Sequence, residues 1–377
     1  MDRARQAGTG PFSGWSILIK DIIDWESHAT RCGADFLAAE SAKQSAKVVQ
    51  DLVSRGAFVT AKSVTTAFAY VDSSKTKNPW NLKHTPGGSS SGSAAAVACG
   101  MARLALGTQT IASINRPASY CGVVGFKPTF GRLPLDGVFP FSPSVDTLGF
   151  FTAGVRDAQT AFSALVSEPP LIYHDVLRVG IVTDLRCDMP EAEMQRVVLD
   201  TAGCLEDAGH QVVPVALSDM FADAYRYHST LIAAEAENSH RHLFDVYRDA
   251  YPARLRDLLL RGRVVTTEER QRIQGHRARV SAELGRIFEC YDVLLSASAP
   301  GPAPFGIAST GDPRMSLIWT YTGVPTLTLP AALSSDGLPL GIQLVGARDD
   351  DQRLLATGVV LEELLGFGCR PQLHQLG

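Results

Sequence analysis

The stretch Gly87-Gly88-Ser89-Ser90-Ser91-Gly92-Ser93 runs directly into Ala94-Ala95-Ala96-Val97-Ala98, and Pro86 precedes it. Glycines allow a close approach of the backbone, and the start of a helix offers unpaired N–H groups. Residues of this composition also form flexible linkers. A linker would not usually run straight into a helix of small, buried residues. We therefore interpret residues 87–93 as a functional loop and residues 94–101 as a closely packed helix.

Strand-like and helix-like segments alternate on both sides of this loop, which is typical of an α/β fold. Glycines follow three of the expected helices, and Thr266 to Glu269 fits a capping box that starts a helix. We find no internal repeat and no long linker, so we expect a single large domain over residues 1–377. Expected strands cover residues 16–23, 57–59, 104–106, 177–182, 293–296, 326–329 and 341–345, and residues 123–126 form a further apolar segment. Expected helices lie within residues 42–53, 94–101, 191–208, 219–290 and 351–365.

Composition excludes several classes of protein. The chain has 377 residues, of which 45% are hydrophobic, and a net charge of −4. Acidic and basic residues are interspersed without a basic stripe, so we expect no nucleic-acid partner. No run approaches the roughly 20 apolar residues of a membrane helix. Asp2, Arg3 and Arg5 are not followed by an apolar segment, so we predict no signal peptide and a cytoplasmic protein. The seven cysteines lack a CxxC pair and are expected to be reduced and mostly buried.

Three residues suggest acyl-transfer chemistry. Ser89 and Ser113 lie in separate loops of small and polar residues, and Lys20 precedes both. A hydroxyl is a poor nucleophile until a base removes its proton, and here the base would be an amine. Each segment alone has a simpler interpretation. Residues 108–117 resemble an ordinary polar loop, and Lys20 could reach solvent or pair with Asp21.

The combination resembles the amidase signature family, and the resemblance extends from about Gly14 to Leu365. Spacing is most similar to the small bacterial members, such as malonamidase. The likeness implies the amidase signature fold, in which helices cover both faces of a mixed β-sheet. Its motifs are Lys20-Asp21, Gly87-Gly88-Ser89-Ser90, Ser113, Cys121-Gly122-Val123-Val124-Gly125-Phe126-Lys127-Pro128-Thr129, Gly323-Val324-Pro325 and Gly337-Leu338-Pro339-Leu340-Gly341-Ile342-Gln343-Leu344-Val345-Gly346.

The resemblance implies a Ser-Ser-Lys triad. Ser113 would be the nucleophile, Ser89 would pass the proton, and Lys20 would be the base. A lysine with its reference pKa of about 10.4 is charged at neutral pH, so burial must favour the neutral amine. Asp21 would oppose that shift, so we expect its carboxylate to point away. The family also has a cis peptide before the bridging serine, here between Gly88 and Ser89.

The same likeness assigns further roles around Ser113. Backbone N–H groups of Thr110, Ile111, Ala112 and Ser113 match the oxyanion hole. Thr108 and Arg116 are expected near the substrate. Arg116 matches an arginine that binds a substrate carboxylate, although an arginine in this place could also pair with an internal acid. No metal and no organic cofactor is required.

The chain departs from the family pattern in two places. Ile111 and Ala112 stand where Gly-Gly usually precedes the nucleophile. Isoleucine tolerates positive φ poorly, so the loop either uses ordinary φ values or is rearranged. Helical segments that usually precede Lys20 are apparently absent. We expect a partner, or a second copy in a homodimer, to cover the surface that this exposes.

These features predict an amide hydrolase that releases ammonia or a small amine from a short amide through an acyl-serine. More specifically, we expect a substrate that carries a second carboxylate. Two alternatives remain: a catalytically degenerate binding protein, and an acyltransferase or amidotransferase subunit. His240 and His242 are expected on a solvated face rather than at a metal, and the acids at 349–351 are expected to be solvated too.

Overall fold

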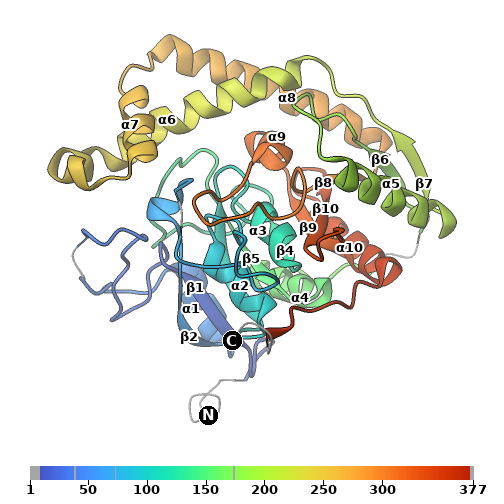
Figure 1. Cartoon of the computed structure of the whole chain (residues 1–377), viewed down its shortest axis with the longest axis horizontal. Coiled ribbons are helices and arrows are strands. Elements are labelled where there is room, and N and C mark those ends of the chain that lie inside the picture. Colours follow the sequence, from blue (N-terminus) through green and yellow to red (C-terminus); the bar gives the residue numbers. More distant parts are fainter. Residues whose placement is uncertain (1–8, 38–39, 73, 173–174, 374–377) are drawn as a thin grey trace.

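Ten strands in the described part of the chain form one mixed sheet, in the order β2-β1-β3-β5-β4-β9-β10-β8-β6-β7 (Figure 1). The computed structural model describes residues 9–37, 40–72, 74–172 and 175–373. Parallel pairs lie at both ends of the sheet, and antiparallel pairs join them in the middle. The strands are β1 (Ser16–Lys20), β2 (Phe58–Ser63), β3 (Leu104–Gln109), β4 (Val124–Lys127), β5 (Thr147–Thr152), β6 (Arg178–Ile181), β7 (Gln211–Pro214), β8 (Val293–Ala297), β9 (Thr326–Leu333) and β10 (Pro339–Gly346).

Helices cover both faces of this sheet. On one face α2 and α3 pack on β3, β4, β9 and β10, and on the other α4, α5 and α10 pack together. The helices are α1 (Lys47–Ser54), α2 (Ser91–Ala98), α3 (Asn115–Cys121), α4 (Val155–Val166), α5 (Ala192–Asp207), α6 (Met220–Tyr247), α7 (Ala253–Gly262), α8 (Thr267–Cys290), α9 (Arg314–Thr322) and α10 (Asp351–Leu365), with short 3₁₀ turns η2 (Ala67–Ala69) and η3 (Arg248–Ala250).

Alternation along the strands separates the two cores. Leu18 and Ala105 belong to the cluster around α2, whereas Ile17, Ile19 and Leu106 belong to the main core on the other face. Successive side chains of a strand point to opposite faces, so each strand buries apolar groups on both sides. The expected α/β fold, with one large domain and a mixed sheet between helical layers, is confirmed.

Helices α6, α7 and α8 form an arm along one side of the molecule, coloured yellow to orange in Figure 1. α6 packs against α7, α8 and α9, and so connects the arm to the sheet domain. The predicted capping box is present at the start of α8, where Thr266 and Glu269 bond each other's backbone N–H groups. Such reciprocal bonds satisfy donors that the first turn of a helix leaves free.

Several expectations were wrong in detail. Thr108 and Gln109 belong to strand β3 rather than to a loop. Helices α3, α4 and α9 and strands β5 and β7 were not predicted. The free cysteines are not mostly buried, because only two are buried and three are exposed. His174, His374 and the N-terminal residues 1–8 lie outside the described residues.

Two supposedly solvated positions are buried instead. His240 has no exposed surface and bonds the Tyr251 hydroxyl at 3.0 Å. Asp351 is 1% exposed and accepts from the Thr129 backbone N–H at 2.7 Å. The described residues contain no cluster of three or more His, Cys, Asp or Glu that could hold a metal ion. Within the same ranges, every helix is too short or too polar to cross a bilayer.

Candidate active site

Lys20 ends strand β1 and is fully buried. Its Nζ atom lies 2.8 Å from the Ser89 hydroxyl and 2.8 Å from the Thr108 hydroxyl. Burial lowers the pKa of Lys20 to about 7, against opposing effects of Asp146 and Cys32. Because half of such lysines are uncharged near neutral pH, this amine can act as a base.

Ser89 lies two residues before α2 and is 1% exposed. The peptide bond between Gly88 and Ser89 is cis, as the resemblance predicts. The Ser89 carbonyl accepts from the Thr66 N–H at 3.3 Å and from the Thr65 hydroxyl at 3.2 Å. These bonds hold the backbone of Ser89 while its hydroxyl faces Lys20.

Ser113 lines a narrow pocket whose volume is about 10 Å³. A volume of about 10–15 Å³ is what one water molecule requires, so a substrate needs the lining to open. No hydrogen bond joins the Ser113 hydroxyl to Ser89 in the part of the chain that the structure describes. The pocket is lined by Ala69, Tyr70, Val71, Thr110, Ile111, Ser113, Arg116, Phe141 and Pro313.

The loop before Ser113 carries a row of free backbone donors. Within the described residues, no hydrogen bond uses the N–H groups of Thr110, Ile111, Ala112 or Ser113. Ile111 and Ala112 are absent from the residues with positive φ, so the loop uses ordinary φ values. Four consecutive unused donors beside a candidate nucleophile have the character of an oxyanion hole.

Four side chains hold this loop, three from β3, α6 and α9 and one from the loop before β5, and sequence reasoning missed all of them. Three of these side chains bond the carbonyl or hydroxyl groups of Thr110 and Ile111. The fourth accepts from backbone N–H groups at the start of α3. The bonds are Thr110 hydroxyl to Asp146 at 2.5 Å, His228 Nε2 to the Thr110 carbonyl at 2.9 Å, Thr320 hydroxyl to the Ile111 carbonyl at 2.7 Å, and the Ile114 and Asn115 N–H groups to Gln109 Oε1 at 2.7 and 3.0 Å.

Asp146 also receives the Phe141 and Ser142 N–H groups, at 2.7 and 2.8 Å. Burial raises the pKa of this carboxyl, and the three hydrogen bonds oppose the rise. Asp146 directly precedes the apolar segment 147–152, and an isolated acid at that place is the one sequence signal that could have identified it. Its position therefore connects the loop at 141–146 to the loop that carries Ser113.

Arg116 is 3% exposed and lies beside Ser113 in the pocket. Its guanidinium donates to the carbonyls of Gly311 at 2.6 Å and Gly88 at 2.7 Å, and to the Thr310 hydroxyl at 2.9 Å. Burial lowers the pKa of Arg116 to about 10. Its Nε atom is buried without a partner, and no acid in the described ranges forms an ion pair with it.

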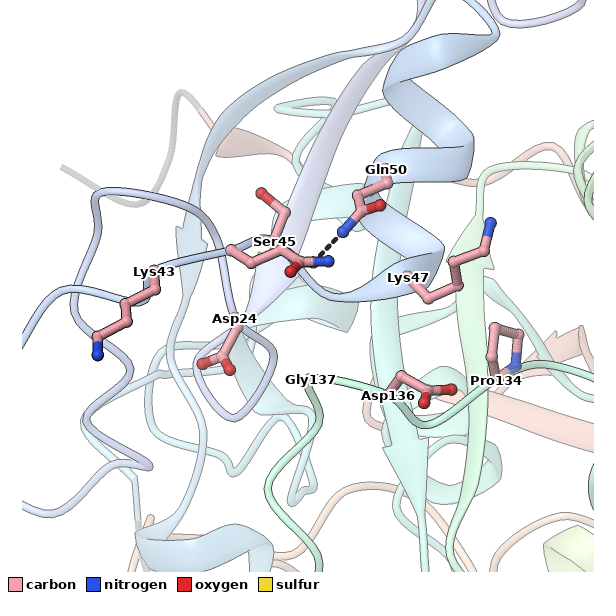
Figure 2. Close-up of a pocket in the computed structure, with 9 residues that line it drawn as sticks. Asp24, Lys43, Ser45, Lys47, Gln50, Pro134, Asp136 and Gly137 are labelled. Atoms are coloured by element: carbon pink, nitrogen blue, oxygen red, sulfur yellow. Dashed lines mark hydrogen bonds between the residues drawn. The ribbon is translucent and has the colours of Figure 1, made fainter.

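The structure thus brings Lys20, Ser89 and Thr108 into direct contact, and it places Ser113 and Arg116 together in the narrow pocket. Thr108, which was expected near the substrate, contacts Lys20. A wider pocket of about 750 Å³ lies elsewhere, at the start of α1 (Figure 2). None of the predicted site residues lines that pocket, whose walls include Asp24, Lys43, Ser45, Lys47, Gln50 and Asp136.

Comparisons with known proteins identify the family of this chain. A family model described as Amidase matches residues 1–355. The chain is 32% identical to a subunit of glutamyl-tRNA(Gln) amidotransferase from Wolinella succinogenes, over 94% of this chain and 90% of that protein. It is 29% identical to the corresponding subunit from Thermoanaerobacter pseudethanolicus, over 96% and 84%. A crystal structure of an amidase superimposes with a TM-score of 0.87 at 29% identity, covering 96% of this chain and 87% of that one.

Proposed function

Because the chain belongs to the amidase signature family, we propose that it hydrolyses a short amide through an acyl-serine formed at Ser113. Lys20 is the base and Ser89 is the bridge. The observation that carries this proposal is the buried contact of 2.8 Å between Lys20 Nζ and the Ser89 hydroxyl. A lysine that burial keeps partly neutral at pH 7 can take the proton of the serine hydroxyl beside it.

The first step is a proton relay. A neutral amine has two N–H groups and one lone pair, so Lys20 can donate to Thr108 while it accepts from Ser89. Ser89 in turn takes the proton of the Ser113 hydroxyl, whose oxygen attacks the amide carbon. Catalytic hydrogen bonds are often long before the substrate binds and shorten in the complex. The missing contact between Ser89 and Ser113 is expected to form at that point.

The attack places a negative charge on the former carbonyl oxygen. The free N–H groups of residues 110–113 supply donors for it. When the tetrahedral intermediate collapses, the C–N bond breaks and the nitrogen takes the proton from Lys20 through Ser89. Ammonia or an amine leaves, and an ester on Ser113 remains. Water then attacks this ester with the same base, and the products are a carboxylic acid and the free serine.

Arg116 supports a substrate with a second carboxylate. It is a buried cation with an unpaired Nε and no ion-pair partner in the described part of the chain. Asp312 acts on Arg116 electrostatically but forms its ion pair with Arg314. Burying a charge without a direct partner is costly, so a bound anion would relieve the cost. Three of the five N–H groups of Arg116 already hold Gly88, Gly311 and Thr310, and Nε is the nitrogen atom that has no partner, so Nε is the group we assign to the substrate.

A second candidate is an amidotransferase subunit. The two relatives described above are subunits of glutamyl-tRNA(Gln) amidotransferase, and the chain covers 84% and 90% of their length. The chemistry on Ser113 would be unchanged. In one version the released ammonia would pass to a partner protein while water still hydrolyses the acyl-serine. In the other, an acceptor on the partner would take the acyl group in place of water.

The test is ammonia release from two amides of equal length. Succinamate carries a terminal carboxylate, and butyramide ends in a methyl group. We expect the purified chain to release ammonia from succinamate in preference to butyramide, and the Ser113→Ala variant to release none. Release only after a partner protein is added would favour the amidotransferase candidate. A folded chain that releases ammonia from neither amide, with or without a partner, would refute the proposal.

A further inference from the structure

Two successive peptide groups before Ser113 are fixed from outside the loop by side chains of the helical layer. His228 of α6 donates from Nε2 to the Thr110 carbonyl at 2.9 Å. Thr320 of α9 donates from its hydroxyl to the Ile111 carbonyl at 2.7 Å. A third carbonyl, that of Ala112, accepts from the Arg116 N–H at 3.0 Å, inside the first turn of α3.

A trans peptide group is planar, and its C=O and N–H bonds point in opposite directions. Among the described residues, the bond between Gly88 and Ser89 is the only cis peptide, so the bonds around Ile111 are trans. A carbonyl held toward α6 therefore turns the Ile111 N–H away from α6. In the same way, the bond from Thr320 turns the Ala112 N–H away from α9.

Thr110, Ile111 and Ser113 line the narrow pocket. The N–H groups that the two bonds orient are the ones that remain unused in the described structure. Ile111 and Ala112 keep ordinary φ values, and the two side-chain bonds fix the directions in which their peptide groups face.

The His228 side chain forms one hydrogen bond among the described residues, the one to the Thr110 carbonyl. It is fully buried, and its Nδ1 atom has no partner among the described residues. Since Nε2 faces a carbonyl oxygen, it must carry the proton, which leaves Nδ1 as a bare acceptor. Burial lowers the pKa of His228 to about 3, so it stays neutral near pH 7. The ring serves as a fixed hydrogen-bond donor and not as a proton carrier.

We propose that His228 and Thr320 are positioning residues that aim the N–H groups of Ile111 and Ala112 at the oxyanion. This inference rests on the proposed function, because it assumes that Ser113 is acylated. It assigns the helical arm, through α6, a direct role in the geometry of the site. Both residues act on the site indirectly, through the carbonyl oxygens of Thr110 and Ile111.

The test compares variants that lose the donor with variants that keep one. His228→Met and Thr320→Val remove the donors at similar size, whereas His228→Gln and Thr320→Ser keep an N–H or an O–H. We expect the first pair to lower kcat for succinamate by about 10-fold to 100-fold, since a small misplacement of catalytic groups can cost about 100-fold. KM should change little, and the second pair should recover most of the rate.

Matched controls are available in two other buried donors to backbone carbonyls. His276 bonds the Met220 carbonyl at 3.1 Å, and Thr201 bonds the Val197 carbonyl at 2.7 Å. His276→Met and Thr201→Val should lower the melting temperature as much as the test variants, but leave kcat within about twofold.

Affinity for propylboronic acid provides a readout that a purely structural role would not change. The tetrahedral boronate formed with a serine hydroxyl reproduces the tetrahedral intermediate and its oxygen in the oxyanion hole, whereas the planar product succinate resembles the ground state. We expect the inhibition constant for the boronate to rise in parallel with the loss of kcat, and that for succinate to stay constant.

Equal loss of both affinities, or no loss of kcat in His228→Met and Thr320→Val, would overturn the inference while the proposed function stands. If the parent chain itself neither turns over succinamate nor binds the boronate, the proposed function fails first.

Discussion

Asp21 follows Lys20 in the chain, yet its carboxylate forms an ion pair with Lys62 at 2.9 Å. Asp21 is not among the groups that shift the pKa of Lys20. The neighbouring carboxylate, which would otherwise favour the charged ammonium, is thus paired on strand β2. Because Lys62 neutralises the Asp21 carboxylate, Lys20 can stay uncharged although an acid follows it in the chain.

The first prediction concerns this compensation. Lys62→Met leaves the Asp21 carboxylate without its ion-pair partner, and it removes a positive charge near Lys20. Both changes favour the ammonium form, so the pKa of Lys20 should rise. The acid limb of the profile of kcat/KM against pH should therefore move to higher pH, by about 0.5–1 unit.

Exposed Lys83 provides the control, and Lys83→Met should leave the profile in place. A profile of Lys62→Met that coincides with that of the parent would show that Asp21 does not reach Lys20 even when unpaired.

The bridging role of Ser89 can be separated from the packing of its loop. Ser89 and Ser90 are both buried, but only the Ser89 hydroxyl contacts Lys20. Ser89→Ala should lower kcat by about 10²–10⁴, the usual contribution of a positioned proton-transfer group. Ser90→Ala should cost less than about tenfold, because Ser90 bonds only the Thr108 backbone. Equal losses in the two variants would contradict the relay.

Arg116 is expected to discriminate between anionic and neutral amides. Arg116→Met should raise KM for succinamate about 100-fold or more, because a charge-assisted pair to a buried carboxylate is lost. KM for butyramide should rise far less. If Arg116 serves only to hold Gly88 and Gly311, both KM values will change together, and the carboxylate assignment will be wrong.

Stability should depend on pH through the two buried lysines. Burial lowers the pKa of both Lys20 and Lys127 from 10.5 to about 7. Between these values the unfolded chain binds more protons than the folded chain, so the free energy of unfolding rises with pH. Each group contributes at most about 1.4 kcal/mol per pH unit.

Urea unfolding at about pH 7 to about pH 8.5 checks this. Cysteines ionise near the upper end of this range, so the comparison is made between proteins that carry the same cysteines. The slope should be smaller in Lys20→Met than in the parent. Slopes that are equal in the two proteins would mean that Lys20 titrates normally in the folded chain.

The sequence predicted the elements with strong local signals. Helix α10 follows the predicted range because an amphipathic pattern leads to Gly366, and α8 begins at its capping box. Helix α3 and strand β5 were missed because they are buried on every side. Such segments have no alternation of polar and apolar residues, and α3 also contains Pro117.

The candidate site was predictable only where family motifs mark it. Lys20, Ser89, Ser113 and Arg116 follow from motif and spacing. His228 could not be distinguished from other histidines of the arm, because its burial depends on how α6 packs against α9. The same limit explains why His240 was placed on a solvated face.

The central claim is that a buried amine at position 20 activates Ser113 through Ser89. A fluorophosphonate probe, with mapping of the labelled peptide by mass spectrometry, tests it most directly. We predict that the label attaches to Ser113, that its rate rises with pH around a midpoint of about 7, the pKa of Lys20, and that Lys20→Met and Ser89→Ala each slow it strongly. Labelling at another residue, or labelling of Ser113 at a rate that ignores both pH and these substitutions, would contradict the account.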